Sequence, residues 1–312
     1  MRSGGYASVE YARSFRCFGD VLTLTRSGLS VIRRAIPGTD LCDCTGLYPY
    51  SVATEWSALA ADIDELRALG AVSLSMVVDP FERDAAVSAV QDWTVARPFK
   101  THFVVDLRRD WRGERAKNTR NSASRALRLH HIETLYGHRE WSNTFWNLYQ
   151  NTVTRHGVVG IQRMSEAVIA EQLDAPGCRV TAAWHDGRVL GVLMTFIRQR
   201  WAELHLVGVD EAGFRLNTSY GLIHAALEMA EGVGCTHANL GGCAGLAEDE
   251  NDGLYQFKKR WARERLHTVL CGLILDPSKY EALVATNDVE DCSFFPEYRA
   301  PGGRYEWHVS GG

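Results

Sequence analysis

The sequence predicts an α/β fold in which a mixed β-sheet is flanked by helices, and its 312 residues are enough for two domains. Three observations support this prediction. Helical apolar spacing alternates with apolar runs of strand length along most of the chain. The Asp186-Gly187 dipeptide joins two such runs as a tight hairpin. A helix and another short strand follow, which is typical of a sheet with mixed strand directions.

Helices are expected where apolar residues recur at helical spacing and a glycine marks the end, as Gly70 and Gly157 do. The predicted helices are 51–69, 82–93, 116–129, 141–156, 165–173, 219–232 and 280–284. The predicted strands are 72–78, 100–107, 179–185, 189–197, 201–209, 236–240 and 267–275. The tail from residue 288 is expected to be irregular.

Composition excludes several classes of protein. The net charge of −4 excludes a molecule that binds nucleic acid over its whole surface, so any such contact needs a local basic patch. Eight cysteines occur without a CxxC pair, and we expect no metal site. No signal peptide or membrane span is recognised, which predicts a cytoplasmic protein with free thiols.

Segment 239–261 carries the strongest signal for chemistry. A predicted strand ends in Gly241 and Gly242, and glycines there let a ligand approach the backbone closely. The acidic loop 248–252 follows, and a carboxylate in it could serve as a general base. Phe257-Lys258 then lies in an expected basic turn, where the lysine could stabilise developing negative charge.

A second signal is the basic stretch 108–128, with eight cations and two acids. Four of the cations recur at spacings that can share one face of the predicted helix: Lys117, Arg120, Arg125 and Arg128. This face is either a solvated basic surface or a platform for phosphates, as in a tRNA acceptor stem or a nucleotide diphosphate. Arginine suits bidentate phosphate contacts.

Five pieces in order resemble one known family. They are KNTRNSASRAL (117–127), FWNLYQNTVTRHG (145–157), VTAAWHDGRVLGVL (180–193), the helix-strand-Gly-Gly unit 220–242, and Phe257-Lys258. Together they resemble the Fem-type branch of the GNAT acyltransferase superfamily, which contains the peptidoglycan-bridge aminoacyltransferases and relatives in antibiotic and polysaccharide pathways. The resemblance covers roughly residues 100 to 285.

The resemblance implies a fold of two GNAT-like halves, each a mixed β-sheet flanked by helices, with a shortened N-terminal half. Residues 1–137 would form the first half, completed by roughly 266–312. Residues 138–265 would form the second half, which carries the Phe-Lys motif.

The resemblance also implies roles for single residues. Lys258 would stabilise the oxyanion, and Phe257 would pack under the reacting ester or fix the lysine, although a core aromatic is equally open. Phosphates of the donor would contact Lys259 and Arg260 together with the four cations at 117, 120, 125 and 128. The implied acceptor-binding residues are Arg155, Tyr220, Gly241 and Gly242.

Each of these roles has a plainer alternative. Lys258 could be a solvated surface lysine. Arg155 could merely complement the dipole of a helix end. The polar residues beside Tyr220 could be N-capping residues of a helix.

The segment 212–221, AGFRLNTSYG, bears on the donor, because by the resemblance it stands where GNAT enzymes hold the CoA diphosphate. No glycine follows Arg215 until Gly221, so we expect weak diphosphate binding there. We therefore predict an aminoacyltransferase that moves an aminoacyl group from aminoacyl-tRNA to a free amine of a peptide, a peptidyl-nucleoside antibiotic or a cell-wall-type precursor, without a cofactor. The alternatives are an acyl-CoA-dependent N-acyltransferase and a non-catalytic module that binds tRNA or glycan.

Overall fold

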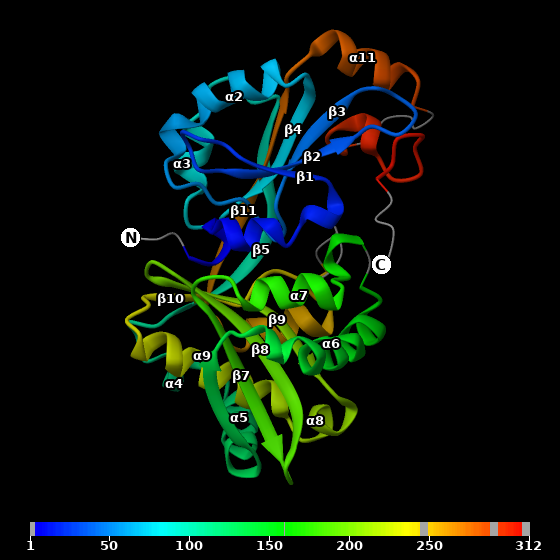
Figure 1. Ribbon diagram of the computed structural model, residues 1–312. Helices are drawn as coiled ribbons and strands as arrows, with labels where there is room; N and C mark the ends of the chain where they lie inside the picture. The colour runs from blue at the N-terminus through cyan, green and yellow to red at the C-terminus, as the bar shows by residue number, and fades with distance from the viewer. Residues whose placement is uncertain (1–3, 159, 244–248, 288–292, 308–312) are drawn as a thin grey trace. The chain divides into compact units, whose positions relative to one another are not determined.

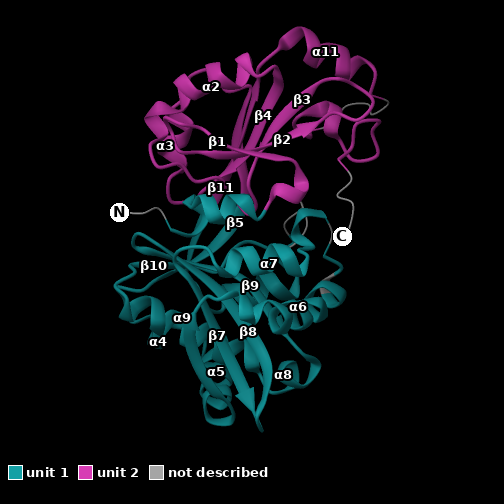
Figure 2. Ribbon diagram, viewed as in Figure 1, with its two compact units in different colours: residues 1–14, 100–266 teal, residues 15–99, 267–312 magenta. Residues whose placement is uncertain are grey.

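The computed structural model describes residues 4–158, 160–243, 249–287 and 293–307. The chain divides into two compact units (Figures 1 and 2). Unit 1 comprises Met1–Ser14 and Lys100–Leu266, and unit 2 comprises Phe15–Phe99 and His267–Gly312. Two long strands, β5 Val95–Asp106 and β11 Glu264–Ile274, carry the chain from one unit into the other.

The sheet of unit 1 has the strand order β5-β10-β9-β8-β7-β6. Its other strands are β6 His131–Tyr136, β7 Cys178–His185, β8 Arg188–Arg198, β9 Trp201–Val209 and β10 His237–Asn239. Strands β6 to β9 are antiparallel neighbours, β10 runs parallel to β9, and β5 runs antiparallel to β10. The parallel pair needs a crossover connection, which the helix after β9 supplies.

Helices cover both faces of this sheet. They are α1 Val9–Arg13, α4 Trp111–Glu114, α5 Lys117–Leu129, α6 Ser142–His156, α7 Glu166–Leu173, α8 Glu211–Arg215, α9 Thr218–Gly232 and α10 Gly253–Lys259. A Cβ at Gly191 of β8 would meet Leu222 of α9, whereas a Cβ at Gly208 of β9 would meet Leu148 of α6. Val192 is the register partner of Gly208 and follows Gly191, so α9 and α6 pack on opposite faces.

Unit 2 has the strand order β1-β2-β3-β4-β11. Its strands are β1 Asp20–Thr23, β2 Ser30–Ala35, β3 Cys42–Gly46, β4 Ala71–Val78 and β11, and its helices are α2 Leu59–Ala68, α3 Arg83–Ser88 and α11 Pro277–Ala285. Strand β4 runs parallel to β3 and antiparallel to β11. The apolar face of α2 packs with β4 in one buried core.

Short 3-10 segments complete the structure. In unit 1 these are η1 Gly5–Ala7, η4 Arg139–Trp141 and η5 Gly160–Gln162; in unit 2 they are η2 Arg16–Phe18, η3 Trp56–Ala58 and η6 Glu297–Arg299. Among the described residues, no helix is both long and apolar enough to cross a membrane.

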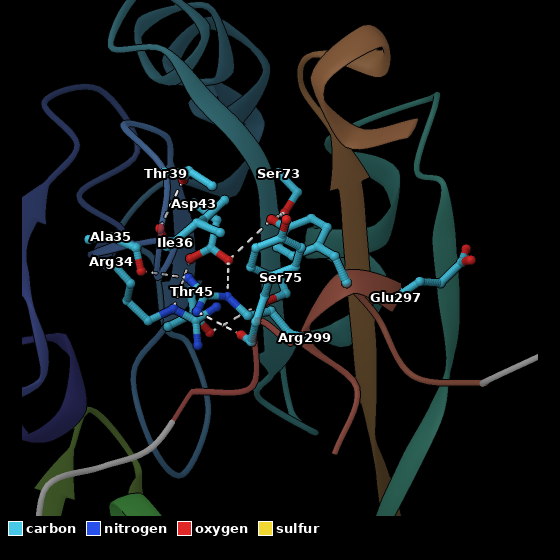
Figure 3. Close-up of polar contacts among 12 residues, drawn as sticks. Arg34, Ala35, Ile36, Thr39, Asp43, Thr45, Ser73, Ser75, Glu297 and Arg299 are labelled. Carbon is cyan, nitrogen blue, oxygen red and sulfur yellow. Dashed lines mark hydrogen bonds and ion pairs between the residues drawn. The ribbon is translucent and has the colours of Figure 1, made fainter. Parts of the chain in front are cut away.

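Unit 2 buries a charged cluster around Asp43 of β3, a side chain with no exposed surface (Figure 3). Its carboxylate accepts hydrogen bonds from Nε of Arg34 (2.9 Å), Nε of Arg299 (2.8 Å) and the hydroxyl of Tyr298 (3.1 Å). The Tyr298 hydroxyl lies 2.8 Å from Oγ of Ser73. One buried carboxylate thus joins strands β2, β3 and β4 to the segment after α11.

The predicted class, a mixed α/β sheet flanked by helices, is confirmed, but two helices are shorter than predicted. The first begins at Trp56 as η3 and becomes α2 at Leu59. Backbone groups of residues 51–55 bond to distant parts of unit 2 instead, as in Ser51 N to Val77 O (2.6 Å) and Thr54 N to Ser27 O (2.9 Å). The second ends at Ser88, and the indole of Trp93 donates to the carbonyl of Val87 (3.1 Å). Strands β1, β2, β3 and β6, which no pattern predicted, complete the sheets.

The two GNAT-like halves that the resemblance implies stay a prediction. Their proposed boundary at 137/138 lies inside unit 1, after β6. Residues 267–312 are in the same compact unit as 15–99.

Candidate active site

Lys258 lies in the last turn of helix α10, so the predicted basic turn is wrong. The helix begins after Asp252, whose Oδ1 accepts hydrogen bonds from the backbone N–H groups of Leu254 (2.8 Å) and Tyr255 (3.1 Å). Asp252, the last residue of the acidic loop, is therefore the N-cap of α10. A helix this short has too little apolar periodicity to be recognised from sequence.

The ammonium of Lys258 is anchored at the end of β10. Its Nζ donates to the carbonyl of Gly242 (2.6 Å). Gly241 has φ +75°, and a Cβ there would lie 3.4 Å from Nζ. A side chain at Gly241 would therefore touch the ammonium, whereas a Cβ at Gly242 would lie 3.0 Å from the carbonyl oxygen of Thr101. Within the described ranges, Gly242 supplies the one acceptor for this ammonium, so two of its three N–H donors can face a ligand.

Strand β5 and the end of β10 add side chains that sequence reasoning missed. Nδ1 of His102 lies 3.1 Å from Oδ1 of Asn239, which also accepts the backbone N–H of Gly241 (2.8 Å). Nζ of Lys100 donates to the carbonyl of Cys243 (3.3 Å). The sequence offered one signal, a polar residue inside each of two predicted strands: His102 in 100–107 and Asn239 in 236–240. Both side chains are buried, and buried polar groups need hydrogen-bond partners.

Burial sets the charges of this cluster. It lowers the pKa of Lys258 to about 8; nearby Lys100 lowers it further, and Cys243 and Asp252 oppose the shift. Burial and the neighbouring Lys258 lower the pKa of His102 to about 3, against the effect of its bond to Asn239. At neutral pH the lysine is therefore mostly charged and the imidazole is neutral.

Phe257 and Tyr220 are brought together on the α9 side of the sheet. The ring of Tyr220 in α9 meets that of Phe257 edge-on, with centroids 5.0 Å apart, and lies 6.1 Å from the ring of Trp261. Both Phe257 and Tyr220 are half-buried against the core of unit 1. This placement is compatible with a core aromatic and with a side chain that fixes the neighbouring lysine.

Five of the six predicted donor-binding cations are exposed, and the sixth, Arg120, is half-buried. Lys117, Arg125 and Arg128 are exposed on α5, and Lys259 and Arg260 are exposed at the end of α10. The start of α5 is next to α10, because the N–H of Ala116 donates to the carbonyl of Arg260 (3.4 Å).

Arg120 differs from these five exposed cations because its guanidinium is bonded to the backbone. Its Nη1 donates to the carbonyls of Gly113 and Arg115, both at 2.7 Å, and its side chain is half-buried. In this structure Arg120 therefore supports the turn before α5, whereas the exposed cations point to solvent.

Arg155 is not brought to Lys258. It lies at the end of α6, which packs on the face of the sheet opposite to α9 and lies beside α7 (Figure 1). Its guanidinium carbon is 4.4 Å above the ring of Phe214 in α8, a side chain that is 60% exposed. The acceptor-binding role of Arg155 stays a prediction.

The described carboxylates of the acidic loop have structural partners. Oε1 of Glu250 accepts from the hydroxyl of Tyr255 (2.8 Å), Oδ1 of Asp249 accepts from the N–H of Asn251 (2.8 Å), and Asp252 caps α10. Glu248 lies outside the described residues. In the described part of the chain, no three His, Cys, Asp or Glu side chains are grouped to hold a metal ion.

Comparison with known proteins identifies the fold. Residues 106–259 match the family model described as the acetyltransferase (GNAT) domain. The FemX crystal structure superposes with a TM-score of 0.68 at 12% identity, covering 88% of this chain and 93% of FemX. Residues 106–259 therefore match a GNAT acyltransferase domain, and the chain has the fold of FemX.

Two further structures share the fold. One is the C-terminal domain of a protein named as lysylphosphatidylglycerol synthetase from Agrobacterium fabrum, with TM-score 0.57, 14% identity, and 86% of this chain and 88% of that chain covered. The other is L-PGS from Bacillus licheniformis, with TM-score 0.55, 14% identity, and coverage of 86% and 92%. No curated protein sequence matches the chain.

Within the matched GNAT domain, the segment before α9 is partly helical. Residues 211–215 form α8, where Arg215 pairs with Glu211 (2.5 Å), and Asn217 adopts a left-handed conformation with φ +61°. The side chain of Asn217 makes no capping bond, and Thr218 Oγ1 lies 3.1 Å from Nε2 of His130. Side-chain capping by Asn217 therefore does not account for this polar cluster.

Proposed function

We propose that this acyltransferase moves an aminoacyl group from aminoacyl-tRNA to a free amine of a peptide, a peptidyl nucleoside or a cell-wall-type precursor. The substrate amine attacks the ester carbonyl directly, so no protein nucleophile is needed. The carbonyl oxygen becomes an oxyanion, which Lys258 stabilises. Collapse of the tetrahedral intermediate breaks the ester bond, releases the tRNA hydroxyl and leaves an amide; the amine proton leaves to solvent or to the departing oxygen.

One observation carries this proposal: the geometry of Lys258. The carbonyl of Gly242 holds the ammonium through one N–H, and two further N–H donors can point toward a reacting oxygen. Such preorganised donors act strongly in a partly dry site, because little solvent competes for them. A pKa of about 8 keeps most of the lysine charged at neutral pH.

An aminoacyl-tRNA donor is supported by the surface of α5. Its sequence, KNTRNSASRALRL, contains no acid, and Lys117, Arg125 and Arg128 are exposed. Cations on one helix can follow a phosphate backbone, and the exposed Lys259 and Arg260 extend this basic surface from α10. The name of the lysylphosphatidylglycerol synthetase structure, which shares the fold, also agrees with aminoacyl transfer.

Acyl-CoA is the alternative donor, and one observation favours it. The backbone N–H groups at the start of α9 lack a side-chain cap from Asn217, and such groups can bind a diphosphate. No glycine lies between Arg215 and Gly221, which argues against the usual loop, because side chains there limit the approach of a ligand.

The test is a transfer assay with two donors, a pool of charged tRNAs and acetyl-CoA, each offered to amine-bearing peptides. Wild type is compared with Lys258→Met and with Lys259→Met, the exposed neighbour that serves as a matched control. We expect transfer from charged tRNA that Lys258→Met abolishes and Lys259→Met leaves largely intact. Transfer from acetyl-CoA alone would replace the proposed donor, and full turnover by Lys258→Met would remove the proposed role of the lysine.

A further inference from the structure

Asn239 is the centre of a small hydrogen-bonded cluster behind the glycines. Its side chain is 2% exposed, and that of His102 is 6% exposed. Oδ1 of Asn239 accepts the N–H of Gly241 (2.8 Å) and lies 3.1 Å from Nδ1 of His102. Because an amide oxygen can only accept, this contact places the imidazole hydrogen on Nδ1.

The backbone around this cluster is held on both sides. The N–H of Leu240 donates to the carbonyl of Phe103 (2.9 Å), and the N–H of Phe103 donates to the carbonyl of Gly241 (3.3 Å). A Cβ at Gly242 would lie 3.3 Å from Cδ2 and 3.4 Å from Nε2 of His102. The imidazole therefore packs directly against Gly242, the residue whose carbonyl receives the lysine.

These contacts form one chain of support from β5 to Lys258. His102 bonds to Asn239, Asn239 holds the N–H of Gly241, and the next residue presents its carbonyl to Nζ at 2.6 Å. A glycine pair is flexible by itself, so the direction of the Gly242 carbonyl must be fixed by its neighbours. Backbone bonds to β5 continue past the end of β10 as far as the carbonyl of Gly241, and the side chain of Asn239 adds a bond to the N–H of Gly241, directly before Gly242.

We infer that Asn239 and His102 are positioning residues, which fix the backbone at Gly241 and Gly242 so that the carbonyl of Gly242 holds the ammonium of Lys258 in a single orientation. This inference rests on the catalytic role proposed for Lys258. It adds that the lysine works only while a buried amide and a neutral imidazole support the backbone to which it is bonded.

Several charged or titratable groups face the ammonium and must be considered together. Lys100 and His102 come from β5, Cys243 follows β10, and Asp252 begins α10. Asn239 is neutral, so replacing it by an apolar residue changes the positioning of the lysine without removing a charge. A change in the pKa or turnover linked to Lys258 in such a variant therefore comes from the lost hydrogen bonds of Asn239 and not from a lost charge.

Two measurements on the full chain test this inference. The first is the rate of acetylation of Lys258 by acetic anhydride as a function of pH, read by mass spectrometry, which gives the pKa of the lysine without any substrate. The second is kcat and KM for amide formation. The variants are Asn239→Leu, which removes the acceptor, Asn239→Asp, which keeps it, and His102→Leu, which removes the donor.

We expect Asn239→Leu to lower kcat by about tenfold or more with little change in KM, because the lysine loses its orientation. Its Lys258 should become better hydrated, so the pKa from acetylation should rise by about one unit. Asn239→Asp should recover most of the kcat lost in Asn239→Leu. Asn147→Leu, on the exposed surface of α6, is the matched control and should change neither measurement.

A folded Asn239→Leu protein with the acetylation profile and kcat of wild type would overturn the inference. If that variant does not fold, the same two measurements on His102→Leu decide: a wild-type acetylation profile and kcat would overturn the inference. Failure of both to fold would also overturn it, because a positioning role predicts a folded but slow enzyme. Unchanged turnover in Lys258→Met would instead refute the proposed function, whatever the acetylation profiles show.

Discussion

Units 1 and 2 share one series of elements, which consists of three antiparallel strands, a helix and a strand parallel to the third. In unit 1 three antiparallel strands, β7, β8 and β9, are followed by α9 and by β10, which is parallel to β9. In unit 2 the strands β1, β2 and β3 are followed by α2 and by β4, which is parallel to β3. In each sheet an antiparallel strand lies next to this parallel strand: it is β5 in unit 1, which precedes the series in the chain, and β11 in unit 2, which follows it.

The units differ where their two parallel strands separate. In unit 1, pairing of β9 with β10 stops at Asn239, and the chain continues as Gly241-Gly242 beside Lys258. In unit 2, Ser51 bridges to Val78 and so continues the sheet. Asp79 then closes the strand end, since its Oδ1 accepts the N–H of Phe81 (2.8 Å).

The same strand topology therefore ends in two different local structures, a glycine pair beside a lysine in unit 1 and a capped strand in unit 2. At the corresponding strand end of unit 2, the Ser51 bridge continues the sheet and the buried carboxylate of Asp79 accepts a backbone N–H. Unit 2 instead buries the Asp43 cluster, which ties its strands to the segment after α11. We therefore assign chemistry to unit 1 and expect changes in unit 2 to act on stability.

The largest effect is expected from Lys258→Met. Loss of an oxyanion donor typically lowers kcat by about 100- to 1,000-fold, and the melting temperature should change little because the side chain is only half-buried. Steady-state kinetics and thermal unfolding check this. A variant that loses activity only in proportion to lost folded protein would contradict the assignment of chemistry to unit 1.

Asp43→Ala should have the largest effect on stability. It leaves the guanidinium groups of Arg34 and Arg299 buried without their carboxylate, which typically costs about 3–5 kcal/mol. Asp20→Ala is the control, because its pair with Arg33 is exposed and contributes about 0–1 kcal/mol. Denaturant unfolding measures both. Equal losses for the two variants would show that the buried cluster has no special role.

The fold class followed from patterns that local physics makes visible. The hairpin at Asp186-Gly187 and the helix ended by Gly157 are local signals, and the structure contains both. Strands β1 to β3 and β6 carried no such signal. β6 is an edge strand whose side chains are mostly half-exposed, so it lacks a continuous apolar run.

Part of the site could be predicted for the same reason. Gly241, Gly242 and Lys258 stood out because two glycines at a strand end and a nearby lysine are close in sequence, and the structure brings them into contact. His102 lies 137 residues from Asn239, and only the pairing of β5 with β10 brings them together. No local pattern could place these two side chains next to each other.

The pH dependence of turnover tests the electrostatics of unit 1. The pKa of Lys258 is lowered to about 8, so its ammonium is present below this pH and is lost as the pH rises through it. We expect kcat, measured where chemistry limits turnover, to fall about tenfold per unit above that point. Lys258→Arg should remove this falling limb, because arginine stays charged. An unchanged limb in that variant would assign it to another group.

A smaller effect is expected from the exposed cations of α5. Replacing Lys117, Arg125 and Arg128 together by Gln should reduce the salt dependence of tRNA binding by a slope of about 2, at roughly 0.7–0.9 per phosphate contact. Lys279→Gln on α11 of unit 2, an exposed lysine paired with Asp276, is the control. Filter binding at several salt concentrations measures the slope, and equal slopes for all proteins would exclude α5 as the donor surface.

The smallest effect comes from a pair of matched glycines. Gly241 of unit 1 and Gly70 of unit 2 both have φ +75°, so replacement by alanine costs each about 1 kcal/mol of backbone strain. Only at Gly241 would the new Cβ meet the lysine, 3.4 Å from Nζ, whereas no atom lies within 4 Å at Gly70. Gly241→Ala should therefore lower kcat about threefold to tenfold beyond its effect on stability, and Gly70→Ala should not. Equal kcat values for the two variants would mean that the contact between residue 241 and the ammonium of Lys258 does not affect turnover. The strand end of unit 1 would then not differ from unit 2 in the way proposed.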